Sequence, residues 1–217
     1  MAPKIKFTRE EMIEAALRVV REKGADALTA KSLSEELGIS TQPVFTCFGT
    51  MDALKSEVYA AVEKLFYSYV EQGLNEEIPF FGFGKKYVRF AQEESELYRL
   101  LLFTPATAET EISGAERAMT HCREIVRPSL MKIYHLGAEE ADRFFRDMWL
   151  VAHGIATLIV TGSCPFSYEE IGKIMTGFSA SILLAIKEIP GFIEGEFDRE
   201  KLFSKIVDGT YIREGKK

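Results

Sequence analysis

Residues 29 to 54, TAKSLSEELGISTQPVFTCFGTMDAL, decide the fold of this chain. Thr29 can cap a short helix with leucines on one face, and Gly38 can adopt the left-handed conformation that ends it. Ser40 is the expected cap of a second helix, and Thr50 of a third. Two helices joined by so tight a turn cross steeply, and the second projects from the surface. The pattern predicts a helix-turn-helix whose second helix reads DNA.

The composition sets limits on the class of protein. The chain has 217 residues, of which 47% are hydrophobic and 28% charged, enough for an extensive core in one or two domains. The net charge of -6 argues against coating nucleic acid through bulk charge. A local DNA-binding face is still compatible with it, because salt screens such fields beyond roughly 8 Å.

Cysteine usage and hydropathy indicate the compartment. The three cysteines are far apart and form no CxxC motif, so neither a disulfide framework nor a zinc knuckle is expected. The N-terminus lacks the apolar run of a signal peptide. The most apolar stretch, residues 148–160, is too short to span a bilayer and predicts a buried helix. We therefore expect a cytoplasmic protein that does not cross a membrane.

Helical periodicity recurs along the whole chain and predicts an all-α fold. We expect a helix-turn-helix domain over residues 1–50, a bridging helix over 51–75 and a larger helical domain over 76–217. Two long helices are expected at residues 138–161 and 168–187. Both carry small side chains on one face: Ala152, Gly154, Ala156, Gly177, Ser181 and Ala185. Such faces favour a four-helix bundle with a second copy, although burial inside one subunit would explain the same residues.

Residues 7–40, followed by TQPVFTCF and TMDAL, resemble the DNA-binding domain of TetR-family transcriptional regulators. WLVAHG at residues 149–154 resembles the WHG motif of one subgroup of C-terminal domains. The resemblance implies an all-α homodimer with an N-terminal three-helix helix-turn-helix domain and a C-terminal helical domain for ligand binding and dimerisation. It implies a regulator, by analogy a repressor, that binds a palindromic double-stranded DNA operator. A small hydrophobic or aromatic effector would release it.

The resemblance also implies which residues contact DNA. Gln42 is expected to bond a base edge, because its amide matches adenine. Thr50 would present a helix N-terminus to a phosphate, and Lys4, Lys6 and Arg9 would form a basic arm. The predicted DNA-binding set is Lys4, Lys6, Thr29, Lys31, Thr41, Gln42, Val44, Phe45, Thr46, Thr50 and Lys55.

Three positions depart from the family pattern. Phe45 replaces a usual tyrosine and could instead pack against the bridging helix, Cys47 replaces a histidine or tyrosine, and Met51 replaces a lysine. Over residues 1–56, eight basic residues balance eight acidic ones, so we predict modest affinity and a shallow salt dependence. These features favour the alternative, a helical small-molecule-binding or interaction protein with weak or lost DNA binding.

Aromatic side chains crowd residues 80–103, where Gly82 and Gly84 interrupt them. Aromatics at helical spacing indicate either a core or a ligand cavity, and the resemblance favours the cavity. The predicted effector lining is Phe83, Tyr87, Phe90, Tyr98, Met119, Cys122, Trp149 and His153. GFGKK at residues 82–86 lacks the glycine pattern of a phosphate loop, and the histidines lack zinc-site spacing. We expect no catalytic residue, no metal and no cofactor.

Overall fold

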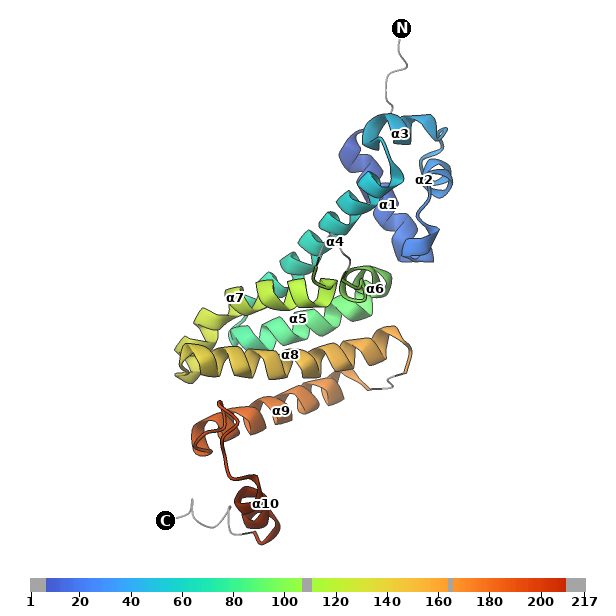
Figure 1. Ribbon diagram of the computed structural model, residues 1–217. Helices are drawn as coiled ribbons and strands as arrows, with labels where there is room; N and C mark the ends of the chain where they lie inside the picture. The colour runs from blue at the N-terminus through green and yellow to red at the C-terminus, as the bar shows by residue number, and fades with distance from the viewer. Residues whose placement is uncertain (1–6, 107–110, 164–165, 210–217) are drawn as a thin grey trace.

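The computed structural model describes residues 7–106, 111–163 and 166–209, and every regular element in this part of the chain is helical. The predicted all-α fold is confirmed. The helices are α1 (Arg9–Lys23), η1 (Ala25–Ala27), α2 (Ala30–Leu37), α3 (Gln42–Phe48), α4 (Met51–Leu74), α5 (Pro79–Glu93), α6 (Ser95–Leu102), α7 (Gly114–Tyr134), α8 (Ala138–Val160), α9 (Tyr168–Glu188) and α10 (Arg199–Val207). Figure 1 shows α1 to α3 at one end, a body of α5 to α9 at the far end of α4, and α10 beyond α9.

The helix starts and stops near the N-terminus are set by local hydrogen bonds. Thr8 and Glu11 form a capping box, in which the Thr8 amide donates to the Glu11 carboxylate at 2.7 Å. Thr29 caps α2, and its hydroxyl accepts the Ser32 amide at 3.1 Å. Gly38 ends α2 with φ 63° and ψ 39°, the left-handed conformation that glycine adopts without steric cost. The predicted cap at Thr29 and the predicted left-handed Gly38 are confirmed.

α3 begins one residue later than the sequence predicts. Its N-cap is Thr41 rather than Ser40, and Thr41 already has helical backbone angles of φ -72° and ψ -22°. Pro43 lies in the first turn, where the missing amide hydrogen removes no helical bond and the fixed φ suits the helix. The proline therefore sets this helix start in place of a side-chain cap.

α4 and α5 touch through their backbones. A Cβ atom on Gly82 would lie 2.2 Å from the carbonyl oxygen of Gly73, and one on Gly73 would lie 2.4 Å from the carbonyl carbon of Gly82. No side chain fits at either position, so both must be glycine for the helices to cross this closely. The crossing fixes the first half of α5 beside the C-terminal end of α4.

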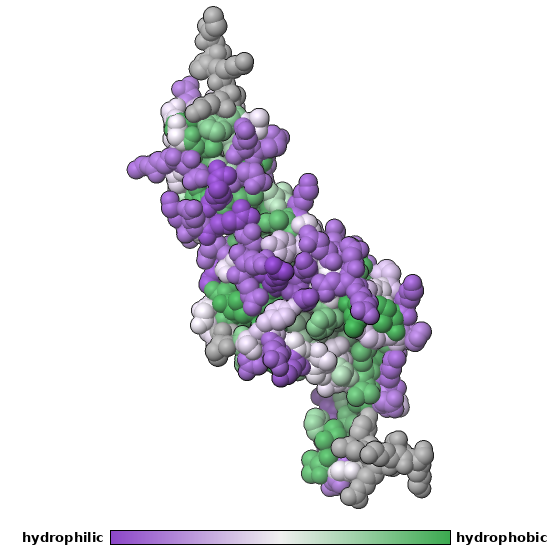
Figure 2. All heavy atoms as spheres, turned by 180° about the vertical axis from the view of Figure 1, so that it is seen from behind, coloured by the Kyte–Doolittle hydropathy of each residue, from purple (hydrophilic) through white to green (hydrophobic). Residues whose placement is uncertain are grey.

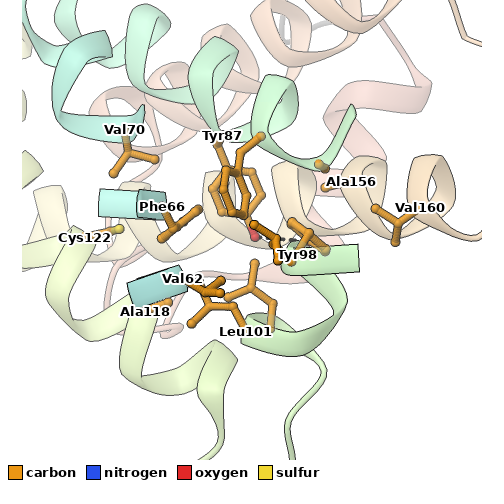
Figure 3. Close-up of a cluster of buried hydrophobic side chains, with 14 of the residues drawn as sticks. Val62, Phe66, Val70, Tyr87, Tyr98, Leu101, Ala118, Cys122, Ala156 and Val160 are labelled. Carbon is orange, nitrogen blue, oxygen red and sulfur yellow. Dashed lines mark hydrogen bonds between the residues drawn. The ribbon is translucent and has the colours of Figure 1, made fainter. Parts of the chain in front are cut away.

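The core is continuous along α4. Five α4 side chains recur every four residues and are at most 1% exposed: Leu54, Val58, Val62, Phe66 and Val70. Phe66 packs edge-on against Tyr87 of α5, with ring centroids 5.6 Å apart. Figure 3 shows these rings among side chains from α4 to α8. The bridging helix therefore shares one core with the helices on both sides of it.

An ion pair also joins the N-terminal helices to the body. The Arg21 guanidinium of α1 donates to both carboxylate oxygens of Glu94, at 2.7 and 3.0 Å. Glu94 is the residue at which α5 ends and α6 begins, so the ion pair connects α1 to the junction of these two helices.

The C-terminal helices are far less buried. α9 buries only Ile171 and Ile186, and α10 buries none of its residues. Phe203 and Val207 of α10 are 62% and 81% exposed. Figure 2 shows the molecule from the side opposite to Figure 1. On this side, hydrophilic side chains cover much of the N-terminal end, and hydrophobic side chains gather on the arm that carries α10.

Candidate nucleic-acid interface and C-terminal cavity

α3 has one buried face and one exposed face at the N-terminal end of the molecule (Figure 1). Val44 and Phe48 are 1% and 7% exposed, and they face the core together because they lie four residues apart. Gln42, Phe45 and Thr46 are exposed. This face offers an amide, an aromatic ring and a hydroxyl group to a partner, and none of the three side chains is charged.

The structure separates the predicted DNA-binding residues into two groups. Val44 is part of the core, so its side chain cannot face a groove, and we correct that assignment. Phe45 is 45% exposed, which removes the alternative that it is a packed core residue. Thr29, Lys31, Thr41, Gln42, Thr46, Thr50 and Lys55 are also exposed. Lys4 and Lys6 lie outside the described residues.

Thr50 builds the next helix start beside α3. Its hydroxyl accepts the Ala53 amide at 3.1 Å, so it is the N-cap of α4. The free amides and the dipole of a helix N-terminus favour an anion. Lys55 and Thr50 are both exposed, within the first turn and a half of this helix.

Several basic side chains of the N-terminal helices are already paired. Arg9 does not extend into an arm, because its guanidinium donates to Glu57 at 2.7 Å and to the Cys47 carbonyl at 2.6 Å. This contact holds the pKa of Glu57 below its ordinary value. Further pairs are Arg18–Glu36 at 2.7 Å, Arg21–Glu94 at 2.7 Å and Lys31–Glu35 at 3.9 Å. Pairing thus reduces the positive charge that this end can offer to phosphates.

Most of the predicted effector residues form a packed core instead of lining an open space. Six of them are at most 4% exposed: Phe83, Tyr87, Phe90, Tyr98, Cys122 and Trp149. Burial raises the pKa of Tyr98 to about 12 and raises that of the Cys122 thiol far above its ordinary value. Tyr87, Tyr98 and Cys122 appear together in Figure 3. Their role in effector binding stays a prediction.

The buried tyrosine hydroxyl groups find hydrogen-bond partners in each other and in a histidine. The hydroxyl oxygens of Tyr87 and Tyr98 lie 3.2 Å apart, and each lies 2.9 Å from Nδ1 of His153. Whether Nδ1 donates or accepts in these contacts depends on the tautomer of the neutral imidazole. Burial lowers the pKa of His153, which keeps the ring neutral.

A cavity of about 360 Å³ lies on the other side of α5, between its first half and α9, with Met148 of α8 and Tyr134 of α7 on its wall. None of the eight predicted effector residues lines it. A second cavity, of about 390 Å³, is lined by Met119 together with Arg123, Arg143 and Arg146. The residues of the first cavity were missed because no local pattern shows that α9 lies over α5.

Comparison with known proteins identifies the fold. Residues 80–175 match the family model described as "Tetracyclin repressor-like, C-terminal domain". The matched region runs from α5 into α9, so this C-terminal domain resembles that of the TetR family. The TetR family consists of transcriptional regulators with a DNA-binding helical fold. The WHG resemblance of residues 149–154 stays a prediction.

A solved structure with a TM-score above 0.5 shares the arrangement of helices. A TetR-like transcriptional regulator from Rhodococcus sp. RHA1 superimposes with a TM-score of 0.62 at 10% identity, over 81% of this chain and 97% of that one. The TetR family repressor AlkX from Dietzia sp. strain DQ12-45-1b, implicated in biodegradation of n-alkanes, gives a TM-score of 0.41 at 16% identity, over 83% and 98% of the two chains. No curated protein is similar enough in sequence to count as a relative.

The described part of the chain has neither a membrane-spanning helix nor a cluster of metal-binding side chains. Within them, no helix is both long and apolar enough to cross a membrane. The same residues contain no group of three or more histidine, cysteine, aspartate or glutamate side chains that could hold a metal ion.

Proposed function

We propose that this protein is a ligand-responsive transcriptional repressor of the TetR family that binds a palindromic operator as a homodimer. The observation that carries the proposal is the exposed face of α3, with Gln42, Phe45 and Thr46 turned away from the core. Each subunit would place α3 in a major groove, with half-sites about one helical turn, roughly 34 Å, or a multiple of it apart. Gln42 would bond a base, while Thr50, Lys31 and Lys55 would contact phosphates.

The exposed faces of α8 and α9 support the dimer. Leu150 of α8 and Leu184 of α9 are 60% and 61% exposed, which is unusual for large apolar side chains on long helices. A Cβ atom on Gly154 or Gly177 would meet no atom of its own chain within 4 Å. Packing within one subunit therefore does not require these small residues, whereas close approach of a second pair of helices does.

The dimer is tested with Gly177→Glu. The subunit has room for this side chain, so we expect a folded monomer in sedimentation experiments, while the natural protein sediments as a dimer. Lys132→Glu, at an exposed position of α7 rather than of α8 or α9, is the matched control and should leave the dimer intact. A dimer in both variants would place the interface elsewhere.

DNA binding is tested by a gel-shift assay on the DNA upstream of the protein's own gene. Gln42→Ala should relax discrimination at one base pair by about 1 to 3 kcal/mol, because it removes a base contact. Lys55→Ala should weaken binding to every sequence about equally. If Gln42→Ala also acted uniformly, Gln42 would not be a base reader.

The salt dependence separates the proposal from its alternative. With several arginines already paired, each subunit offers few cations to phosphates, and we expect a slope of log affinity against log salt shallower than about -4. A slope as steep as about -8 would contradict this expectation. Complete absence of a shift on any upstream DNA would instead favour a helical small-molecule-binding protein that has lost DNA binding.

A further inference from the structure

The cavity between α5 and α9 has an apolar wall and an apolar rim. Phe80, Met148 and Ile171 on its wall are at most 7% exposed. At its mouth, Ile78, Phe81 and Tyr168 are 46 to 54% exposed. Large apolar side chains around a hollow are typical of a surface that a ligand covers. The volume of about 360 Å³ lies within the range of roughly 300 to 1,000 Å³ for small-molecule sites.

Two glycines shape this cavity. A Cβ atom on Gly84 of α5 would lie 2.6 Å from Cε of Met175, so glycine allows the Met175 side chain to reach down onto α5. Gly172 lines the cavity, and a Cβ atom there would meet nothing within 4 Å. The empty volume therefore begins directly at the α9 backbone. Met148 and Met175 are flexible and can adjust to the shape of an apolar ligand.

The lining contains one charged side chain. Lys85 of α5 lies among otherwise neutral residues, with only the hydroxyls of Thr176, Ser179 and two tyrosines as further polar groups. Its Nζ lies 3.4 Å from Glu76, and both side chains are about one third exposed, at 36 and 33%. An ion pair this exposed is weak. A ligand anion can therefore take its place beside Lys85.

We propose that this cavity binds the effector and selects an amphipathic anion, with an apolar body under α9 and a single negative head group at Lys85. This assignment rests on the proposed regulatory function. Ligand in the cavity would press on the first turns of α5, where α5 touches α4 at Gly82 and Gly73. The same cavity disfavours a cationic head group, because Lys85 would repel it.

Three probes with the same tail test the selection: decanoate, decanol and decyltrimethylammonium, each titrated below its micelle concentration into the full chain by calorimetry. We expect decanoate to bind at least 10-fold more tightly than the other two. Equal affinity for the cationic probe, or no decanoate binding, would overturn the proposal.

Four variants locate the binding site. Gly172→Leu should abolish decanoate binding because the leucine occupies the cavity, whereas Gly172→Ala adds one methyl group and should reduce affinity only slightly. Lys85→Met should weaken decanoate about 10-fold and leave decanol unchanged. Lys86→Met is the matched control, because Lys86 bonds Gln72 at 3.3 Å and does not line the cavity. Unchanged decanoate affinity in Gly172→Leu would show that the ligand binds elsewhere.

The two levels of the proposal can fail separately. If decanoate binds as described but does not weaken operator binding in a gel shift, the binding site is supported and its regulatory role is refuted. If the protein binds operator DNA but calorimetry detects no decanoate binding, the proposed function as a regulator is supported and the assignment of the effector to this cavity is refuted. A melting temperature at or above that of the natural protein confirms that Gly172→Leu is folded.

Discussion

The two faces of α5 differ in how completely they are packed. On one face, Tyr87 and Phe90 are fully buried, and the buried hydroxyl of Tyr87 has partners. On the other, Phe81 and Lys85 border an open cavity beneath α9. The Tyr87 ring packs against Phe66 of α4, Tyr98 of α6 and Trp149 of α8, whereas α9 contributes only two buried side chains. The difference teaches that a dense group of aromatic residues can be a closed core, while the open space lies where packing around a single charged side chain is incomplete.

The largest expected effect comes from truncating one phenylalanine on each face. Phe90→Ala should lower the free energy of unfolding by about 3 to 5 kcal/mol, because it leaves a cavity in a packed core. Phe81→Ala, at a side chain that is 46% exposed, should cost less than about 1 kcal/mol. Urea unfolding at one fixed protein concentration measures both. Similar losses would mean that the two faces are equally packed.

Replacing glycine by alanine should change the free energy of unfolding in opposite directions at two positions. Gly82→Ala should destabilise by about 1 to 3 kcal/mol, because the new Cβ overlaps the α4 backbone. Gly172→Ala should stabilise by about 0.5 to 1 kcal/mol, because it meets no neighbour and reduces the flexibility of the unfolded chain. Thermal unfolding gives both values. A stable Gly82→Ala variant would show that the helices can separate.

Removing one hydroxyl group should matter only in the packed face. Tyr87→Phe leaves the Tyr98 hydroxyl with one partner fewer, and we expect a loss of about 1 kcal/mol. Tyr168→Phe, at the cavity mouth, is the matched control and should be neutral. Equal results for the two variants would argue against a contribution from the buried network.

The smallest effect is a dependence on pH. The pKa of His153 is lowered in the folded protein by burial, so the unfolded chain takes up a proton first as pH falls below its ordinary value of 6.5. Stability from this group is present above that pH and decreases as the pH falls towards the folded pKa. The loss between pH 7.5 and 5.5 should be larger in the natural protein than in His153→Leu. An identical loss would remove His153 as the cause.

Local signals made the N-terminal fold predictable. The Thr8 and Glu11 capping box and the left-handed Gly38 depend on residues within one turn of each other, so the sequence alone reveals them. The predicted N-cap at Ser40 is wrong, because Pro43 in the first turn sets the start of α3 at Gln42. The assignment of Val44 to the DNA surface is wrong because its burial depends on the neighbouring helices.

The cavity could not be predicted in the same way. Lys85 and Gly172 are brought together by the packing of α5 and α9, whose sequences are separated by α6, α7 and α8. Two of the aromatic residues that were predicted to bind the effector, Tyr87 and Trp149, pack against each other instead, with ring centroids 4.8 Å apart. Gly172 lies inside α9, in its second turn, and no turn or helix end explains a glycine there; this was the available signal.

The backbone contact between Gly73 and Gly82 has a mechanical consequence. A helix pinned at one end can move only by tilting about that point, and α4 extends from this pivot for its remaining length of roughly 33 Å to the base of α3. A tilt of about 5° would then displace the far end by roughly 3 Å, about the spacing of one base pair along DNA. In the proposed dimer, such a displacement would change the distance between the two α3 helices and so weaken their fit to one operator.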